Sequence, residues 1–171
     1  MTVSRNLRVG AINRAEAFTR YASLWVRADR DKKMILNIDE AAIMIGQAPS
    51  KAWAPIGEPN VAFEGCCTPK RFTLLLGIMD NGEFFGQLIE GSCTGVIFAD
   101  YLTKIGKSAH KNRCIVICDN ATIHRTGYVQ QATKEAGIDL NFVPPYYPTG
   151  SPIEYLFSIL KGRIARDPPV D

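Results

Sequence analysis

Residues 113–120 read Arg-Cys-Ile-Val-Ile-Cys-Asp-Asn, and this stretch decides the fold. Its apolar centre predicts a short strand that is buried on both faces of a sheet. A second run, Lys33-Met-Ile-Leu-Asn-Ile-Asp39, has the same form and also ends in a carboxylate. The loops that follow such strands diverge and leave room for a ligand. The two runs therefore place Asp39 and Asp119 at one edge of a sheet, provided that the strands are neighbours.

The surrounding pattern predicts an α/β fold, a mixed sheet flanked by helices on both faces. Strands at 71–79 and 83–90 flank Asp80-Asn81-Gly82, which predicts a hairpin because Asn-Gly tolerates positive φ at both central positions. A preceding strand near Val61–Gly65 would complete an antiparallel meander. Apolar spacing and helix end signals predict the other elements: helices at 12–28, 94–108, 125–136 and 152–166, a strand at 138–143, and loops at 46–60 and 144–148. On the first helix the expected apolar stripe is Phe18, Tyr21, Leu24 and Trp25.

Composition is that of an ordinary globular protein. The 171 residues, 46% of them hydrophobic and 22% charged, fit one domain and exclude disorder, collagen and coiled coil. No apolar run reaches the ~18 residues of a membrane span, and Met1–Arg8 lacks a signal-peptide stretch. We therefore expect a cytoplasmic or nuclear protein with no membrane partner. Five cysteines without a C-x-x-C pair argue against structural zinc and favour buried, reduced thiols.

Charge is unevenly distributed along the chain. Residues 1–33 hold eight basic and three acidic residues, a net charge of +5 in a chain whose net charge is +3. A basic leading segment suits a polyanion partner. A solvated helix face would give the same pattern, and charge alone does not decide between the two.

Glu154 joins Asp39 and Asp119 as a third candidate carboxylate, one turn into the last helix. Three converging carboxylates need a cation, because close carboxylates otherwise raise one another's pKa. Magnesium fits, since it prefers oxygen ligands and keeps several waters. Each residue also has a purely structural alternative. The two aspartates could be turn residues, and Ser151-Pro-Ile-Glu154 has the form of a capping box.

Several ordered motifs resemble the mariner superfamily of DDE transposases. They are Ile38-Asp39-Glu40, Trp53-Ala-Pro-Ile-Gly57, the Cys-Asp-Asn-Ala-Thr-Ile-His run at 118–124, and the segment from Phe142 to Lys161 with its Pro-Pro-Tyr-Tyr-Pro and Ser-Pro-Ile-Glu boxes. Asp119 and Glu154 are separated by 34 residues, a spacing found in this superfamily. The resemblance covers nearly the whole chain, from about Arg5 to Arg166.

This resemblance implies a ribonuclease-H-like fold and a metal-dependent DNA cleavage and strand-transfer site. It makes Asp39, Asp119 and Glu154 the catalytic, metal-binding triad, with two Mg²⁺ or Mn²⁺ ions as cofactor. The implied partner is DNA, both transposon ends and target, and a homodimer is a further candidate. The implied division is a basic leading helix at 1–32, the catalytic domain at 33–167 and a short tail at 168–171.

Other residues are candidates for supporting the triad or contacting DNA, each with an ordinary packing or solvation alternative. They are Asn120, His124, Arg125, Lys161, Trp53 and Tyr146. The sequence departs from the family pattern at Ser151, where asparagine is usual, and at Tyr147, where serine is usual. The family's DNA-recognition domains are not evident in these residues, so we expect no sequence-specific DNA binding by this chain alone.

Two other functions remain open at this point. The chain could be a catalytically silent or repurposed transposase remnant that binds DNA or dimerises. It could also be an unrelated ribonuclease-H-like nuclease that acts on RNA–DNA hybrids, because a fold does not fix a function.

Overall fold

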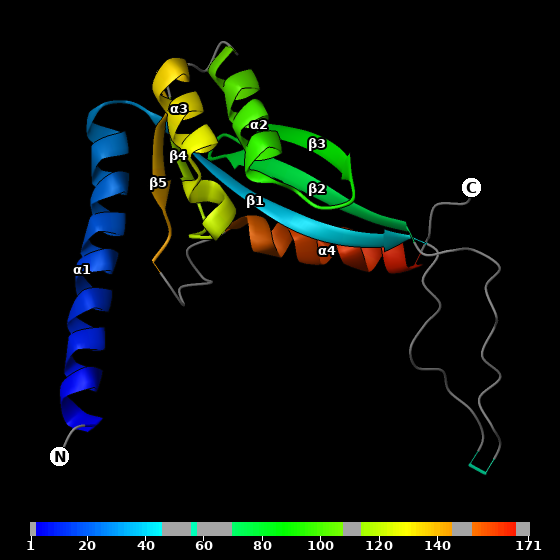
Figure 1. Ribbon diagram of the computed structural model, residues 1–171, viewed down its shortest axis with the longest axis horizontal. Coiled ribbons are helices and arrows are strands. Elements are labelled where there is room, and N and C mark those ends of the chain that lie inside the picture. Colours follow the sequence, from blue (N-terminus) through cyan, green and yellow to red (C-terminus); the bar gives the residue numbers. More distant parts are fainter. Residues whose placement is uncertain (1–2, 46–55, 58–69, 108–113, 145–151, 167–171) are drawn as a thin grey trace.

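A five-stranded mixed sheet forms the centre of the computed structural model, in the order β3-β2-β1-β4-β5 (Figure 1). The structure describes residues 3–45, 56–57, 70–107, 114–144 and 152–166, with the backbone alone for 3–14 and 165. The strands are β1 (Met34–Ile45), β2 (Lys70–Met79), β3 (Phe84–Glu90), β4 (Cys114–Cys118) and β5 (Asp139–Phe142). The helices are α1 (Val3–Arg30), α2 (Gly95–Lys107), the 3₁₀ turn η1 (Thr122–Arg125), α3 (Gly127–Ala136) and α4 (Pro152–Arg166). The predicted α/β class is confirmed.

Strand β1 is the centre of the sheet and is longer than predicted. It pairs parallel with β4 and antiparallel with β2 from Leu36 to Ile45. The prediction that this strand stops at Asp39 is wrong, because pairing with β2 continues for six more residues on the other side. β1 therefore takes the place in the meander that we assigned to a strand near Val61–Gly65, a segment outside the described residues. Most of the expected loop at 46–60 and the loop at 144–148 also lie outside them.

The hairpin between β2 and β3 is confirmed, but its turn differs from the prediction. Gly82 has φ of +87°, whereas Asn81 does not adopt positive φ. Gly82 N–H donates to the Met79 carbonyl at 2.9 Å, and Met79 N–H donates to the Glu83 carbonyl at 2.8 Å. This is the pattern of a three-residue loop closed by a glycine bulge. The glycine alone supplies the left-handed conformation that the turn needs.

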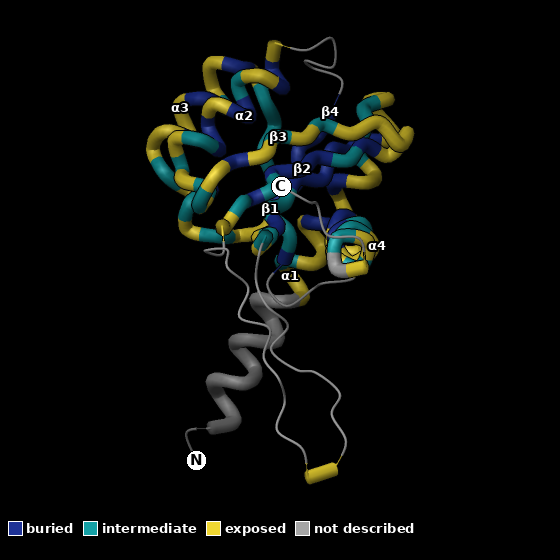
Figure 2. The backbone as a smooth tube through the Cα atoms, turned by 90° about the vertical axis from the view of Figure 1, so that its right-hand side faces the viewer, coloured by how far each residue is buried: buried dark blue, intermediate teal, exposed yellow. Residues whose placement is uncertain are grey.

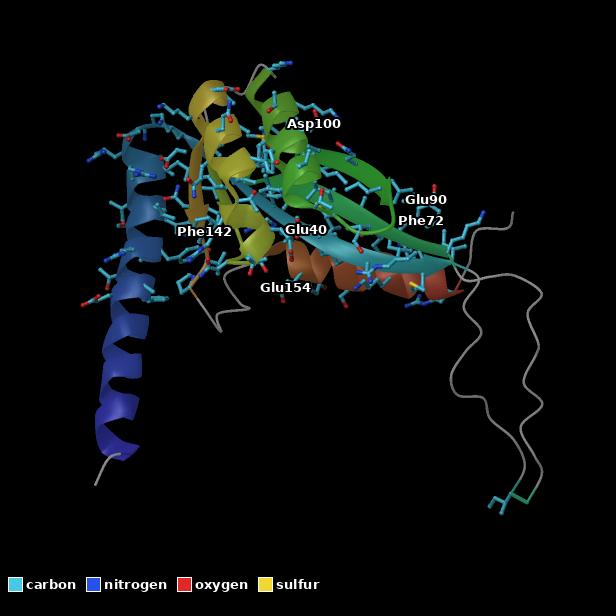
Figure 3. All side chains as sticks on the ribbon, viewed as in Figure 1. Glu40, Phe72, Glu90, Asp100, Phe142 and Glu154 are labelled. Carbon is cyan, nitrogen blue, oxygen red and sulfur yellow. The ribbon has the colours of Figure 1, made fainter. Side chains whose placement is uncertain are left out.

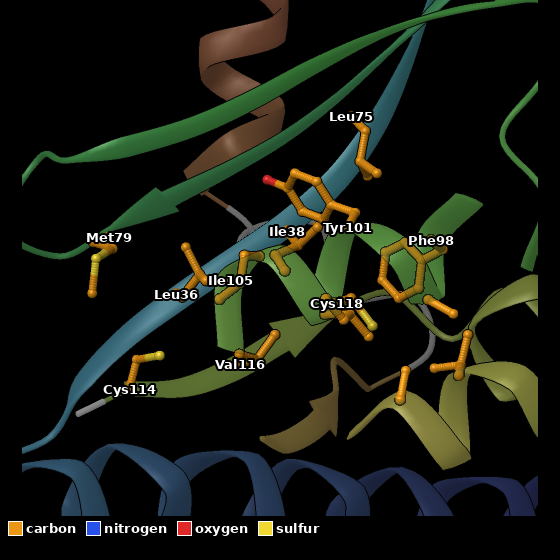
Figure 4. Close-up of a cluster of buried hydrophobic side chains, with 14 of the residues drawn as sticks. Leu36, Ile38, Leu75, Met79, Phe98, Tyr101, Ile105, Cys114, Val116 and Cys118 are labelled. Atoms are coloured by element: carbon orange, nitrogen blue, oxygen red, sulfur yellow. The ribbon is translucent and has the colours of Figure 1, made fainter. Parts of the chain in front are cut away.

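The larger core lies between the sheet and the pair of helices α2 and α3 (Figure 4). On this face the even-numbered β1 residues Leu36 and Ile38 meet Phe98, Leu102 and their neighbours, all almost fully buried. Burying each such side chain stabilises the fold by about 1.5–3 kcal/mol. Figure 2 shows the resulting band of buried residues through the strands. The thiols of Cys114 and Cys118 are buried in this core and are not joined in a disulfide, as predicted.

Helices α1 and α4 cover the opposite face of the sheet. Tyr21 and Leu24 of α1 pack on the odd-numbered residues of β1 and β4, and Arg27 forms a 2.5 Å ion pair with Asp139 of β5. On α4, Ile153 and Phe157 pack on Ala41 and Leu76. The predicted apolar stripe of α1 is only partly buried. Tyr21 and Leu24 are buried as predicted, whereas Phe18 is 47% exposed and Trp25 is 43% exposed.

The helices predicted at 94–108 and 152–166 are close to the observed bounds, whereas α1 begins nine residues before the predicted start at residue 12. The helix expected at 125–136 is divided, because the extended residue Thr126 separates η1 from α3. Gly137 ends α3 in the left-handed conformation, with φ of 64°, as its position predicts. None of the helices in the described part of the chain is both long and apolar enough to cross a bilayer. The proposed division at 32 and 167 stays a prediction, and 168–171 lies outside the described residues.

Two helical glycines give a test of the α2–α3 packing. A Cβ on Gly106 would lie 2.5 Å from the Ala136 Cβ, whereas a Cβ on Gly162 of α4 would meet nothing within 4 Å. We expect Gly106→Ala to lower the free energy of unfolding by about 1–3 kcal/mol through overpacking. Gly162→Ala is the matched control and should raise it by about 0.5–1 kcal/mol. Urea unfolding of both variants measures this, and equal effects would contradict the close packing.

Candidate active site

The parallel pairing of β1 and β4 places Asp39 beside Asp119. The last paired residues are Ile38 and Cys118, and each aspartate is the next residue along its chain. Asp119 follows the end of β4, as predicted, but Asp39 lies inside β1 rather than at its end. The two strands are thus neighbours, which is the condition on which the expected meeting of Asp39 and Asp119 depended. Strand β4 ends at Cys118, whereas β1 continues to Ile45. Beyond Ile38, the edge of β1 that faced β4 is therefore no longer paired with it.

Alternation along β1 points Asp39 to the face that α4 covers. The side chains of a strand alternate between faces, and the odd-numbered neighbours Ile35 and Ala41 pack on α1 and α4. Glu154 lies in the first turn of α4, directly after the fully buried Ile153 that anchors this turn. Figure 3 shows Glu154 at the start of α4, next to the centre of the sheet. The three predicted carboxylates therefore come from three elements that meet at one place.

The electrostatics of Asp39 reflect this convergence. Burial is the main cause that raises the pKa of Asp39 to about 6, and the negative charges of Asp119, Glu40 and Glu154 contribute to the same rise. The Glu40 N–H donates to Asp39 Oδ1 at 2.7 Å and opposes the rise. Asp39 is therefore a carboxyl group whose charge is not fully compensated by its protein surroundings, which is the condition that a bound cation relieves.

His124 connects the site to the interior. Its side chain is fully buried, and its ring stacks on Phe98 with centroids 4.2 Å apart. Nδ1 lies 2.8 Å from Asp119 Oδ1, and Nε2 lies 2.8 Å from Glu40 Oε1. Burial alone lowers the pKa of His124, but the hydrogen bonds to Asp119, Cys118 and Glu40 outweigh it and raise this pKa to about 12. His124 in turn holds the pKa of Asp119 below its usual value.

Glu40 is the residue that sequence reasoning missed. It appears in the first motif only as the neighbour of Asp39, yet it binds His124 from the opposite face of β1. Glu40 also lies beside Cys93, whose pKa rises to about 11 through burial, the Glu40 charge and a hydrogen bond to Glu40. Strand alternation was the available signal, because it separates two consecutive acidic residues onto opposite faces.

The other candidates have varied positions. Asn120 is exposed directly after Asp119, and Lys161 is exposed on α4. Arg125 is exposed and its guanidinium lies over the Phe142 ring, 5.2 Å from the centroid. The candidates Trp53 and Tyr146, together with the cap residue Ser151, lie outside the described residues.

The donor chemistry of the site fits a hard divalent cation. Asp39, Asp119 and Glu154 offer carboxylate oxygens, the ligands that Mg²⁺ and Mn²⁺ prefer. Within the described residues, however, no three His, Cys, Asp or Glu side chains already lie close enough to hold a metal ion. Asp119 directs Oδ1 to His124 and to the Ala121 N–H, 3.0 Å away. The structure thus brings the three acidic residues to one place without forming a closed cage.

Removing the charge of Asp39 should stabilise the protein in the presence of a chelator. Asp39→Asn keeps an acceptor for the Glu40 N–H but removes a carboxylate whose pKa is raised from 3.8 to about 6. A raised carboxyl pKa costs stability above pH 6, and the cost fades as pH falls towards 3.8. We expect a gain of about 1–2 kcal/mol at pH 7, allowing for screening of a partly exposed group. Denaturant unfolding at pH 7 and pH 4 measures it, and a loss of stability at pH 7 would contradict the electrostatic account.

Comparison with known proteins identifies the family. The profile of the DDE superfamily endonucleases matches residues 34–171. Among curated proteins, none matches this sequence. The structure resembles the Mos1 transposase paired-end complex with left transposon end, with TM-score 0.62, 18% identity, and coverage of 89% of this chain and 48% of that one.

Two further structures share the fold. The Mos1 transposase catalytic domain with raltegravir and Mg gives TM-score 0.62 and 17% identity, covering 90% of this chain and 71% of that one. A simian T-cell lymphotropic virus intasome, in complex with a PP2A regulatory subunit, gives 0.53 and 17%, with coverage of 80% and 43%. The chain spans about half the length of the Mos1 chain in the paired-end complex. These likenesses confirm the ribonuclease-H-like fold of transposases and integrases, and the profile match shows that the chain belongs to the DDE superfamily of endonucleases.

Proposed function

We propose that this chain is the catalytic domain of a mariner-type transposase, which cleaves DNA at transposon ends and joins the ends to target DNA. One observation carries the proposal. Asp39 and Asp119 follow the last residue pair of two parallel central strands, and α4 brings Glu154 to the same face. Phosphoryl transfer depends mainly on positioning and charge neutralisation, and an all-carboxylate site of this kind can supply both through bound cations.

Asp39, Asp119 and Glu154 are the residues that would hold Mg²⁺ or Mn²⁺, two ions in our proposal. When bound, such ions activate a water or a 3′-hydroxyl and stabilise the leaving oxygen. The chain's own contribution is placement. The Glu40 N–H holds Asp39, His124 and the Ala121 N–H hold Asp119, and buried Ile153 fixes the turn that carries Glu154.

Nearby polar and basic residues are proposed DNA contacts. Lys161 lies seven residues after Glu154 and therefore on the same side of α4, about two turns further on. Arg125 stands exposed above Phe142, close in the chain to Asp119. Asn120 is exposed beside Asp119 and would donate to a phosphate oxygen. We retain Trp53 and Tyr146 as candidates for stacking on unpaired bases. We also propose that the chain binds DNA and forms a homodimer.

The proposal predicts nicking of supercoiled plasmid in the presence of Mn²⁺ or Mg²⁺. Asp39→Ala, Asp119→Ala and Glu154→Ala should each reduce nicking to the level measured in chelator, because each removes a cation ligand. Asp100→Ala is the matched control, since Asp100 is an exposed carboxylate on α2 (Figure 3) that forms a surface ion pair with Lys104. It should nick like the wild type.

The same assay separates the alternatives. Equal nicking by the wild type and Asp119→Ala would defeat the proposal and leave a contaminating nuclease or a silent remnant. Cleavage confined to RNA–DNA hybrids would favour a ribonuclease-H-type enzyme instead. Joining of duplex oligonucleotides with free 3′-hydroxyl ends to the plasmid would support strand transfer.

A further inference from the structure

We propose that Glu40 is a positioning residue, which acts through His124 to hold the Asp119 carboxylate in the orientation that binds a cation. The inference rests on the proposed function and extends it to a residue outside the triad. Glu40 is adjacent to Asp39 in sequence, so its acidic side chain would ordinarily be grouped with the metal ligands.

The geometry of β1 separates Glu40 from the triad. Even-numbered residues of β1, such as Leu36 and Ile38, face α2 and α3, whereas Asp39 faces α4. The Glu40 side chain is 15% exposed and its Oε1 lies 2.8 Å from His124 Nε2. The two consecutive carboxylates therefore lie on opposite faces of one strand, and Glu40 approaches Asp119 through the histidine ring.

His124 is a rigid connection between the two carboxylates. Its ring is fully buried, packs on Phe98, and places one nitrogen 2.8 Å from each partner. Both partners are carboxylates, which accept, so the protonated ring donates from both nitrogens and cannot rotate without breaking both bonds. Fixing one ring nitrogen with Glu40 thus fixes the direction in which the other donates to Asp119.

Asp119 is the member of the triad that needs such support. Its side chain is 57% exposed and it stands beyond the end of β4, where no strand partner restrains it. The His124 and Ala121 contacts both use Oδ1, so they fix the carboxylate and leave Oδ2 outside these bonds. Outer groups that orient a metal ligand in this way are worth about 10–100-fold in metal affinity.

Substitutions at Glu40 test the proposal through Mn²⁺ binding, measured by titration calorimetry on the whole chain. Glu40→Gln keeps an acceptor at the same reach but loses the charge, whereas Glu40→Asp keeps the charge but is one methylene shorter. We expect the Glu40→Gln variant to bind Mn²⁺ with near wild-type affinity. The Glu40→Asp and Glu40→Ala variants should both bind Mn²⁺ about 10–100-fold more weakly. A direct ligand or a long-range charge effect gives the opposite order, with Asp above Gln, and would overturn the proposal.

A structural role alone is tested with Tyr101→Phe, which removes a buried 2.8 Å hydrogen bond to the Phe85 carbonyl on the same face of the sheet. This control should lower the melting temperature and leave Mn²⁺ affinity unchanged. For Glu40→Asp and Glu40→Ala, we also expect the Mn²⁺ concentration for half-maximal nicking to rise more than the maximal rate falls, whereas Glu40→Gln should match the wild type in both.

The outcomes are distinguishable from failure of the proposed function. Wild-type protein that neither binds Mn²⁺ nor nicks DNA would overturn the proposed function and this inference together. Wild-type binding that is unchanged in Glu40→Ala, or reduced no more than in Tyr101→Phe, would overturn this inference alone. Should Glu40→Ala fail to fold, the order of the Gln and Asp variants still decides.

Discussion

The parallel register between β1 and β4 is the constraint on which the site depends. It runs from Met34 opposite Cys114 to Ile38 opposite Cys118, and the residue after each final partner is an aspartate. This register is fixed by burial, because a slip of one residue would turn every apolar side chain of a strand to the wrong face. The packing of Ile115 and Ile117 against α1 therefore determines where the carboxylates lie.

The same alternation gives two adjacent acidic residues different roles. Asp39 faces α4 and carries an uncompensated charge, whereas Glu40 faces the core and is compensated by buried His124. A buried carboxylate is costly unless it is paired and hydrogen-bonded. The core thus tolerates Glu40 because of the histidine, whereas Asp39 has no such partner and bears the repulsion of the neighbouring carboxylates, Glu40 included.

Local patterns in the sequence were enough for most of the fold. The apolar runs before Asp39 and Asp119, the turn at Gly82 and the left-handed Gly137 each depend on a few neighbouring residues. Features that join residues far apart in the chain could not be predicted from such local patterns. The extension of β1 to Ile45 depends on β2, whose partners lie some 25 residues or more along the chain. The contact between Glu40 and His124 joins residues 84 positions apart.

The position of Glu154 depends both on a local sequence motif and on long-range packing. The place of Glu154 in the last helix follows from the sequence, but the direction in which it faces depends on how α4 packs on the sheet. Ile153 and Phe157 bury one side of α4 against Ala41 and Leu76. Consecutive helical residues are separated by about 100°, so anchoring Ile153 in the core brings Glu154 to the rim of that contact. An apolar residue with no chemistry of its own thereby orients the third carboxylate. The position of Glu154 at the site consequently depends on the packing of the core.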